Sequence, residues 1–182
     1  MVHFSEIESL RTSLQFLAYS EAYLESAGRL CGFLAKYPAE SNYPKGTVVL
    51  SLAFHSIELF FKAAILEKAP NEKFKGNIGH ELDDLGKRYS NLYPGKKYIF
   101  EIPFRYEDMN LVDPDPGIVE KLQLLADEQK RNTPLSQLYR YPRNTTGNPW
   151  GGIYAFEASS FTRELAKIEQ DIKRLKELIF NR

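Results

Sequence analysis

The sequence holds very little cysteine and no excess of charge of either sign. Of its 182 residues only Cys31 is a cysteine, and 24 Lys and Arg balance 24 Asp and Glu. A single cysteine excludes an internal disulfide and fits a reducing compartment, and its apolar neighbours Leu30 and Leu34 predict a buried structural thiol. The balanced charge argues against a strongly basic nucleic-acid-binding surface but leaves room for a local basic patch.

Signals for a membrane, a metal or a bound cofactor are also missing. There is no apolar run of about 18 residues, and residues 1–10 lack the charged and apolar segments of a signal peptide. We therefore expect a cytoplasmic protein without membrane contact. The three histidines and Cys31 lack metal-ligand spacing, and no Gly-rich phosphate loop or G-x-S-x-G motif occurs, so we expect no metal site and no cofactor. No internal repeat occurs, and the length predicts a single domain over residues 1–182.

The dominant feature of the sequence is helical periodicity. Apolar residues at helical spacing, with capping residues and prolines at their ends, predict five helices. These cover residues 5–36, 47–69, 80–93, 115–131 and 157–180. Residues 98–104 look extended, and a short strand there is compatible with Pro103. Without alternating strands and helices, the pattern favours an all-α, up-and-down bundle with a long irregular loop before the last helix.

The helix expected at 47–69 is apolar almost all round, which predicts that it is the most buried element. Its polar residues Ser51, His55, Glu58 and Lys62 step by four, three and four and so form one narrow stripe. In a structural interpretation, Glu58 and Lys62 make a favourable i,i+4 pair on the polar side of the helix. In a functional interpretation, the stripe faces the irregular loop or a dimer partner, and His55 with Glu58 forms a weak acid–base pair.

The loop before the last helix contains RYPRNTTGNPWGG, residues 140–152, whose prolines and glycines exclude a regular helix or strand. Its rings Tyr141 and Trp150, together with Tyr139 just before it, are suited to stacking on bases, and Arg140 and Arg143 to holding phosphates. Alternatively, the aromatic residues plug the end of the bundle while an arginine pairs with an acidic side chain. The stretch is long for a connection inside a compact bundle, which favours a functional role.

Three stretches resemble the HEPN superfamily of helical domains. They are SLAFHSIELFFKAAI in the central helix, GHELDDLGKRY downstream of it, and the late RYPRN. The resemblance is to bacterial members in which an E-x-x-x-K helix precedes GH-x-L. It implies an up-and-down bundle that usually pairs as a dimer. Many members are metal-independent endoribonucleases with an R-x(4–6)-H motif, in which Arg binds the scissile phosphate and His takes the proton of the ribose 2′-hydroxyl. Others are noncatalytic and bind RNA, nucleotides or proteins.

This sequence departs from the catalytic pattern of that family. Arg143 matches the arginine and Asn144 follows it, but Asn148 stands where the histidine is required. Asparagine cannot act as a base near neutral pH. No histidine follows His80, so His80 and His55 are weak candidates for a displaced base. The alternative for His80 is local packing and hydrogen bonding at the start of a helix.

We therefore expect a HEPN-like protein, noncatalytic or weakly catalytic, that binds RNA or a nucleotide, in a toxin–antitoxin or defence system. A metal-independent endoribonuclease with a displaced base and a protein-interaction module without a ligand are the alternatives. The expected partners are a second copy in a homodimer, RNA or a nucleotide, and a protein such as an antitoxin. The candidate ligand-binding residues are Arg140, Tyr141, Arg143, Asn144, Asn148 and Trp150.

Overall fold

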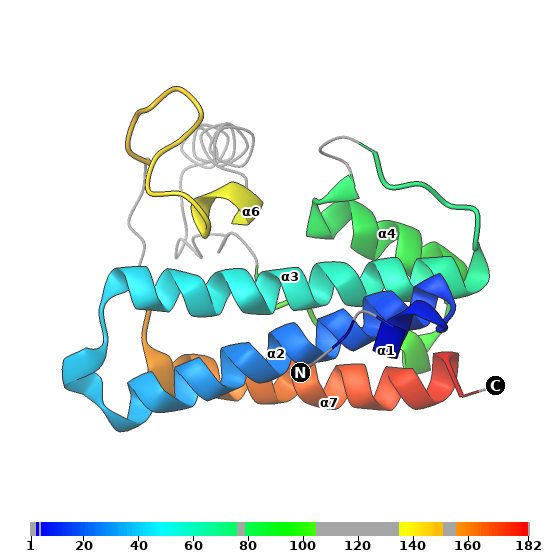
Figure 1. Cartoon of the computed structure of the whole chain (residues 1–182), viewed down its shortest axis with the longest axis horizontal. Helices are drawn as coiled ribbons and strands as arrows, with labels where there is room; N and C mark the ends of the chain where they lie inside the picture. Colours follow the sequence, from blue (N-terminus) through cyan, green and yellow to red (C-terminus); the bar gives the residue numbers. More distant parts are fainter. Residues whose placement is uncertain (1–2, 4, 76–78, 105–134, 151–155, 182) are drawn as a thin grey trace, which may run out of the picture.

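The computed structural model describes residues 3, 5–75, 79–104, 135–150 and 156–181, and all regular structure in these ranges is helical (Figure 1). The longer helices are α2 (Thr12–Lys36), α3 (Tyr43–Lys68), α4 (Leu82–Leu92) and α7 (Ala158–Ile179). Two short helices, α1 (Ser5–Glu8) and α6 (Leu135–Leu138), and the 3-10 turns η1 (Pro38–Glu40) and η3 (Lys96–Tyr98) complete the described elements. The predicted all-α bundle is confirmed.

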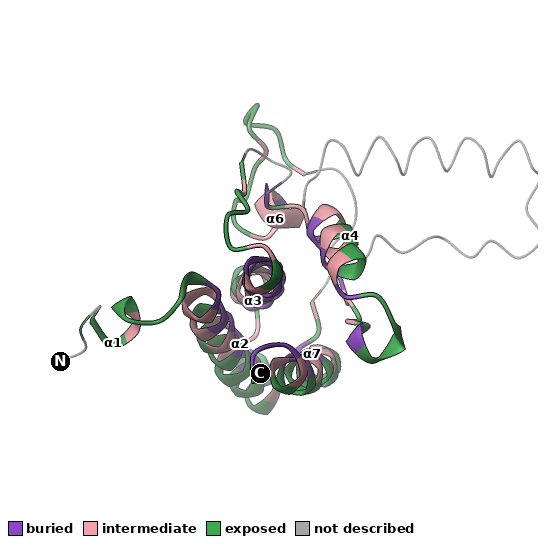
Figure 2. Cartoon of the chain, turned by 90° about the vertical axis from the view of Figure 1, so that its right-hand side faces the viewer, coloured by how far each residue is buried: buried purple, intermediate pink, exposed green. Residues whose placement is uncertain are grey.

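Helix α3 runs through the centre of the bundle. Seen end-on, it lies between α2 and α7 on one side and α4 and α6 on the other (Figure 2). Fifteen of its 26 residues are buried, more than in any other described helix, as the sequence predicts. The apolar core joins residues from α2, α3, α4 and α7 into one cluster. By length and composition α3 is able to cross a membrane, but 72% of its most apolar window is buried inside the protein, as expected for the core helix of a bundle.

Helices α2 and α3 are antiparallel neighbours. Ser20 on α2 and Ser56 on α3 are fully buried, and each hydroxyl donates to the other residue's backbone carbonyl at 2.8 Å. Nearer the ends of the two helices, Ser13 Oγ donates to Glu67 Oε2 at 2.7 Å. These polar contacts fix the alignment of the two helices within an otherwise apolar interface.

The start of α3 differs from the prediction. It begins at Tyr43, four residues before residue 47, and Asn42 Oδ1 caps it by accepting a hydrogen bond from the backbone N of Lys45 at 3.0 Å. Pro44 lies in the first turn, where its missing N–H has no partner to lose. The proline therefore starts the helix, whereas the sequence analysis placed it in the connection.

Three other expectations require correction. The helix expected at 5–36 is interrupted between α1 and α2, where the Arg11 side chain contacts Glu67 and the backbone O of Phe180. Helix α4 begins at Leu82 because Glu81 is extended, so His80 precedes the helix. Residues 98–104 form the end of η3 and an irregular segment, without a strand.

The remaining sequence predictions concern the last two expected helices and the cysteine. The helix expected at 115–131 lies outside the described residues. Helix α7 matches the expected 157–180 closely, with Glu157 as its N-cap accepting from the backbone N of Ser160. Cys31 is buried, its thiol donates to the Ala158 carbonyl at 3.3 Å, and burial raises the pKa of that thiol. These features make it a structural cysteine, as predicted.

Candidate functional site

A fully buried carboxylate, Glu58, lies in the middle of α3. Buried carboxylates are uncommon unless they are paired. Its Oε1 accepts hydrogen bonds from Lys62 Nζ at 2.6 Å and from His80 Nδ1 at 2.8 Å, and its Oε2 accepts one from His55 Nδ1 at 3.2 Å. Arg140 Nη2 lies 3.9 Å from Oε2. We call these five residues the Glu58 cluster.

The Glu58 cluster is assembled from separate parts of the chain. His55 and Lys62 lie one turn before and after Glu58 on the same face of α3. His80 stands just before α4, and Arg140 just after α6. Both of these helices lie on the side of α3 opposite to α2 and α7 (Figures 1 and 2). Tertiary packing therefore brings a loop arginine and a loop histidine to the polar stripe of the central helix.

Phe74 packs both on the cluster and close to Gly79, the residue before His80. The Phe74 ring covers Lys62, with 5.4 Å from Nζ to the ring centroid, and leaves the lysine side chain only 7% exposed. Gly79 is buried, and a Cβ there would lie 3.1 Å from the backbone carbonyl carbon of Phe74. This close approach favours glycine immediately before His80, the residue whose imidazole contacts Glu58.

The Glu58 cluster carries excess positive charge. Burial disfavours the charged form of Glu58, but hydrogen bonds from His55 and Lys62 outweigh it and lower the pKa of the carboxyl to about 2. The ionised carboxylate neutralises one cation, whereas Lys62 and Arg140 supply two, before either imidazole is protonated. Solvent reaches 37% of the Arg140 side chain. The cluster is therefore able to attract an anion from solution.

Acidic residues limit the direction from which an anion can approach. Glu81, Asp83 and Asp84 follow His80 directly in the chain. Burial, followed by the charges of Asp84 and Asp83, raises the pKa of the Glu81 carboxyl. Because this side of the cluster repels anions, an anion is better placed on the side of Arg140 and His55.

The contacts to Glu58 also assign the tautomers of both imidazoles. A carboxylate only accepts hydrogen bonds, so Nδ1 carries the proton in His55 and in His80. Arg140 Nη2 lies 3.3 Å from the same Nδ1 of His55. Because both of these atoms are donors, we interpret this as a packing contact, with the attraction of Arg140 directed at Glu58. In each neutral ring Nε2, the nitrogen away from the carboxylate, is left with a lone pair that can accept a proton or a hydrogen bond.

The other loop residues selected from the sequence bind to one another. Arg143 Nη1 donates to the Gly147 carbonyl at 3.0 Å, and Asn144 Oδ1 accepts from the backbone N of Asn148 at 2.9 Å. Trp150 Nε1 donates to the Tyr141 carbonyl at 2.7 Å. We call residues 140–150 the 140–150 loop. Residues 143–148 thus form a self-contained turn, and Arg140 is the described loop residue that reaches the Glu58 cluster.

Three rings take different positions around this region. Tyr139 packs against Phe54 and Phe104 and so fills the bundle, whereas Tyr141 is 58% exposed. Tyr23 of α2 is not among the residues predicted from the sequence. Its ring centroid lies 4.6 Å from that of His55, with 86° between the ring planes. In the sequence, this contact is indicated only by the short connection between α2 and α3, which predicts that the two helices are neighbours. Ser51, at the start of the predicted stripe, is half-buried on α3 two turns before Glu58.

A metal ion does not fit this arrangement. Within the described residues no group of three or more His, Cys, Asp or Glu side chains has the geometry of a metal site. Both oxygens of Glu58 already accept N–H donors, and two cations stand beside them. The residues present are suited to binding an anion.

Comparison of the chain with protein-family models, with curated proteins and with solved structures finds no match. Functional inference therefore depends on the geometry of the Glu58 cluster and on the three stretches that resemble HEPN domains.

Proposed function

We propose that this chain is a HEPN-like protein that binds the phosphate of RNA or of a nucleotide at the Glu58 cluster, with little or no cleavage. The supporting observation is that Arg140, His55 and His80 converge on one buried carboxylate that does not neutralise all the cations around it. Arginine N–H groups commonly hold phosphate, whereas each neutral imidazole has its one N–H on Glu58. The HEPN resemblance supports a cytoplasmic homodimer in a toxin–antitoxin or defence system, with a protein partner such as an antitoxin.

Weak catalysis follows from the position that matches the family motif. A base beside an arginine-held phosphate contributes about 10²- to 10⁴-fold to the rate. Asn148 cannot act as that base, and its backbone N and the Arg143 side chain are engaged within the 140–150 loop. Binding does not need a base, because phosphate capture depends on cations and N–H donors.

A metal-independent endoribonuclease is the second candidate function. It is favoured by the two imidazoles that anchor Nδ1 on Glu58 and leave Nε2 for proton transfer. Cleavage through the ribose 2′-hydroxyl needs one group to remove the proton of that hydroxyl and another to protonate the leaving 5′-oxygen. His55 and His80 would be these two groups, with Arg140 stabilising the charge that develops on the phosphate.

Binding of labelled RNA, measured by fluorescence anisotropy in EDTA at low salt, tests the proposed function. Arg140→Ala should weaken binding roughly tenfold, because a charge-assisted phosphate contact is lost. Arg143→Ala is the matched control, since it removes the same side chain from the same loop without touching the Glu58 cluster. Its affinity should stay within about twofold of the wild type, the difference expected when no direct phosphate contact is lost. Equal losses in the two variants would contradict the proposal.

Cleavage of the same RNA separates the candidate functions. Binding without cleavage supports the first candidate. Robust cleavage in EDTA that disappears in both His55→Ala and His80→Ala would establish the second. Absence of both binding and cleavage at low salt would leave a protein-interaction module as the remaining interpretation.

A further inference from the structure

Tyr23 brings an aromatic ring to the Glu58 cluster from a third side. It lies on α2, while the cluster residues come from α3 and from the loops before α4 and after α6. Its ring meets that of His55 nearly at a right angle, with 4.6 Å between the centroids. In such an edge-to-face pair each ring covers at most one face of the other. Since both residues are half-buried, the pair lies where the core meets the surface.

A second ring follows the arginine of the cluster. Tyr141 is the next residue after Arg140 and is 58% exposed. Its backbone carbonyl accepts the Trp150 indole N–H at 2.7 Å, which fixes the backbone beside the arginine. Tyr23 therefore stands beside His55 in space, and Tyr141 stands beside Arg140 in the chain. An anion without a base would contact only the cations of such a surface and leave the aromatic rings without a role in binding.

We propose that Tyr23 is a ligand-binding residue that packs against the planar base of a ligand whose phosphate is held by Arg140. This inference rests on the proposed function and assigns the side chain that recognises the base of its ligand. It excludes a bare polyanion as the preferred ligand. Stacking on an aromatic side chain tolerates any base, so the site selects for the presence of a base and not for its identity.

A purely structural role for Tyr23 gives a different result in binding experiments. A ring that only orients His55 would affect every phosphate ligand alike, because His55 lies 3.3 Å from the Arg140 side chain that holds the phosphate, whether or not a base follows. A ring that packs on a base would affect base-bearing ligands alone. The two roles are therefore separated by comparing oligouridylate with inorganic polyphosphate of similar length.

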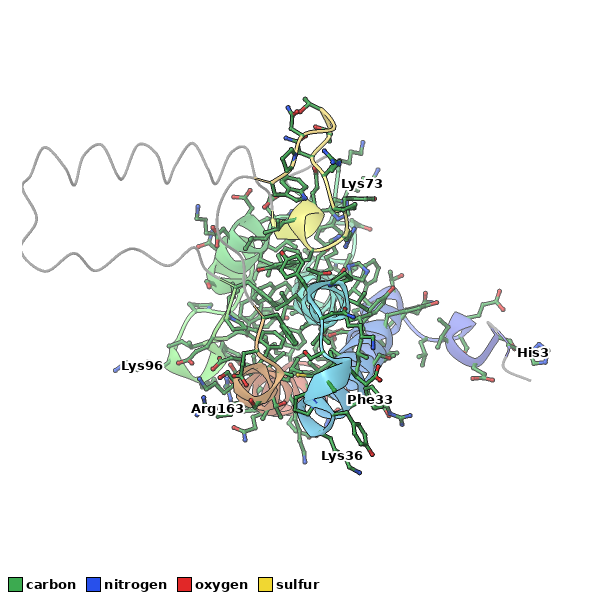
Figure 3. The ribbon with its side chains drawn as sticks, turned by 90° about the vertical axis from the view of Figure 1, so that its left-hand side faces the viewer. His3, Phe33, Lys36, Lys73, Lys96 and Arg163 are labelled. Atoms are coloured by element: carbon green, nitrogen blue, oxygen red, sulfur yellow. The ribbon has the colours of Figure 1, made fainter. Side chains whose placement is uncertain are left out.

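The test uses wild type, Tyr23→Leu, Tyr23→Phe and Tyr37→Leu, with fluorescein-labelled oligouridylate as the probe and polyphosphate as the competitor. Tyr23→Leu should weaken oligouridylate binding roughly tenfold, within the range for one stacked base, and leave competition by polyphosphate unchanged. Tyr23→Phe should bind like the wild type, because it keeps the ring. Tyr37→Leu is the control, since it removes another partly exposed tyrosine at the C-terminal end of α2. That end, marked by Phe33 and Lys36, lies opposite the 140–150 loop (Figure 3).

Each other outcome overturns part of this interpretation. An equal loss for both ligands in Tyr23→Leu, or no loss for either, would refute the role of Tyr23. The proposed function would still stand if Arg140→Ala weakens binding as expected. Failure of the wild type to bind either ligand would refute the proposed function itself, and the inference with it. Thermal melting of each variant shows whether a loss of binding reflects unfolding.

Discussion

The Glu58 cluster and the 140–150 loop are adjacent and use the same kinds of side chain, yet they are built in opposite ways. The cluster joins residues far apart in the chain around one buried carboxylate, with His80 coming 22 residues after Glu58. The loop is exposed, and beyond Arg140 the hydrogen bonds of its described residues connect positions at most nine apart. Arg140 and Arg143 are three residues apart, but one pairs with the core and the other with its own loop. Long-range contacts therefore assemble the charged side chains of the Glu58 cluster, whereas local hydrogen bonds determine the shape of the loop.

The difference has a clear energetic consequence. Removing one partner of a buried ion pair leaves an uncompensated charge in the core and typically costs about 3–5 kcal/mol. Removing an exposed partner costs about 0–1 kcal/mol, because water replaces it. Substitutions in the cluster should therefore reduce the global free energy of unfolding, whereas those in the loop should act locally.

The largest effect is expected for Glu58→Gln, which keeps the shape of the side chain but removes its charge. Lys62 would then be a buried cation without a counter-charge, and the free energy of unfolding should fall by about 3–5 kcal/mol. Urea unfolding followed by circular dichroism measures this. Glu25→Gln is the control, because Glu25 pairs with Arg29 on the exposed side of α2. Similar free energies of unfolding for the two variants would show that the buried charge of Glu58 does not stabilise the folded protein.

The acid dependence of stability should come next in size. The pKa of Glu58 is about 2 in the folded protein, against 4.5 for an ordinary Glu, so its contribution is fully present above pH 4.5 and is lost as the pH falls toward 2. The size is on the order of 3 kcal/mol, at about 1.4 kcal/mol for each pH unit between the two values. Urea unfolding at a series of pH values measures it. Glu58→Gln should lack this component, and an unchanged acid profile in that variant would contradict the assignment.

Substitution of two glycines extends the comparison between the cluster and the loop. Alanine is disfavoured at Gly79 by contact with Phe74, and at Gly147 by the backbone conformation. Gly79→Ala places a Cβ against the Phe74 backbone and should cost about 1–3 kcal/mol as an overpacked site. It should also displace His80 from Glu58. Nuclear magnetic resonance of the histidine side chains would detect that change. An unaltered His80 signal would show that Phe74 does not set the position of the imidazole.

Gly147→Ala should have the smallest effect. Gly147 has φ +81°, a backbone conformation that costs other residues about 1–2 kcal/mol, and no atom lies near its missing Cβ. The strain should be released by local rearrangement of the exposed loop, detected as faster proteolysis there with little change in global unfolding. Asparagine tolerates this conformation better than alanine, so Gly147→Asn should resist proteolysis more than Gly147→Ala. Equal sensitivity of the two variants would argue against backbone strain as the cause.

The helices could be predicted from the sequence because amphipathic periodicity is a local property. It placed α7 within one residue at each end and identified α3 as the central helix. The interruption between α1 and α2 could not be predicted, because long-range contacts of Arg11 stabilise it. For the same reason, the stripe from His55 to Lys62 was visible in the sequence, but its meeting with His80 and Arg140 was not. Nothing in the local sequence distinguishes Arg140 from Arg143.

The paired serines between α2 and α3 have a consequence for ligand recognition. A slide of one helical turn would separate Ser20 from Ser56 and leave their hydroxyls without these partners in an apolar interface, at about 1–3 kcal/mol for each unsatisfied group. Tyr23 lies one turn beyond Ser20, and His55 immediately precedes Ser56. The alignment that keeps those two rings together is thus encoded by hydroxyl groups buried out of reach of any ligand. Selection for binding would act on Ser20 and Ser56 as well as on the residues that touch the ligand.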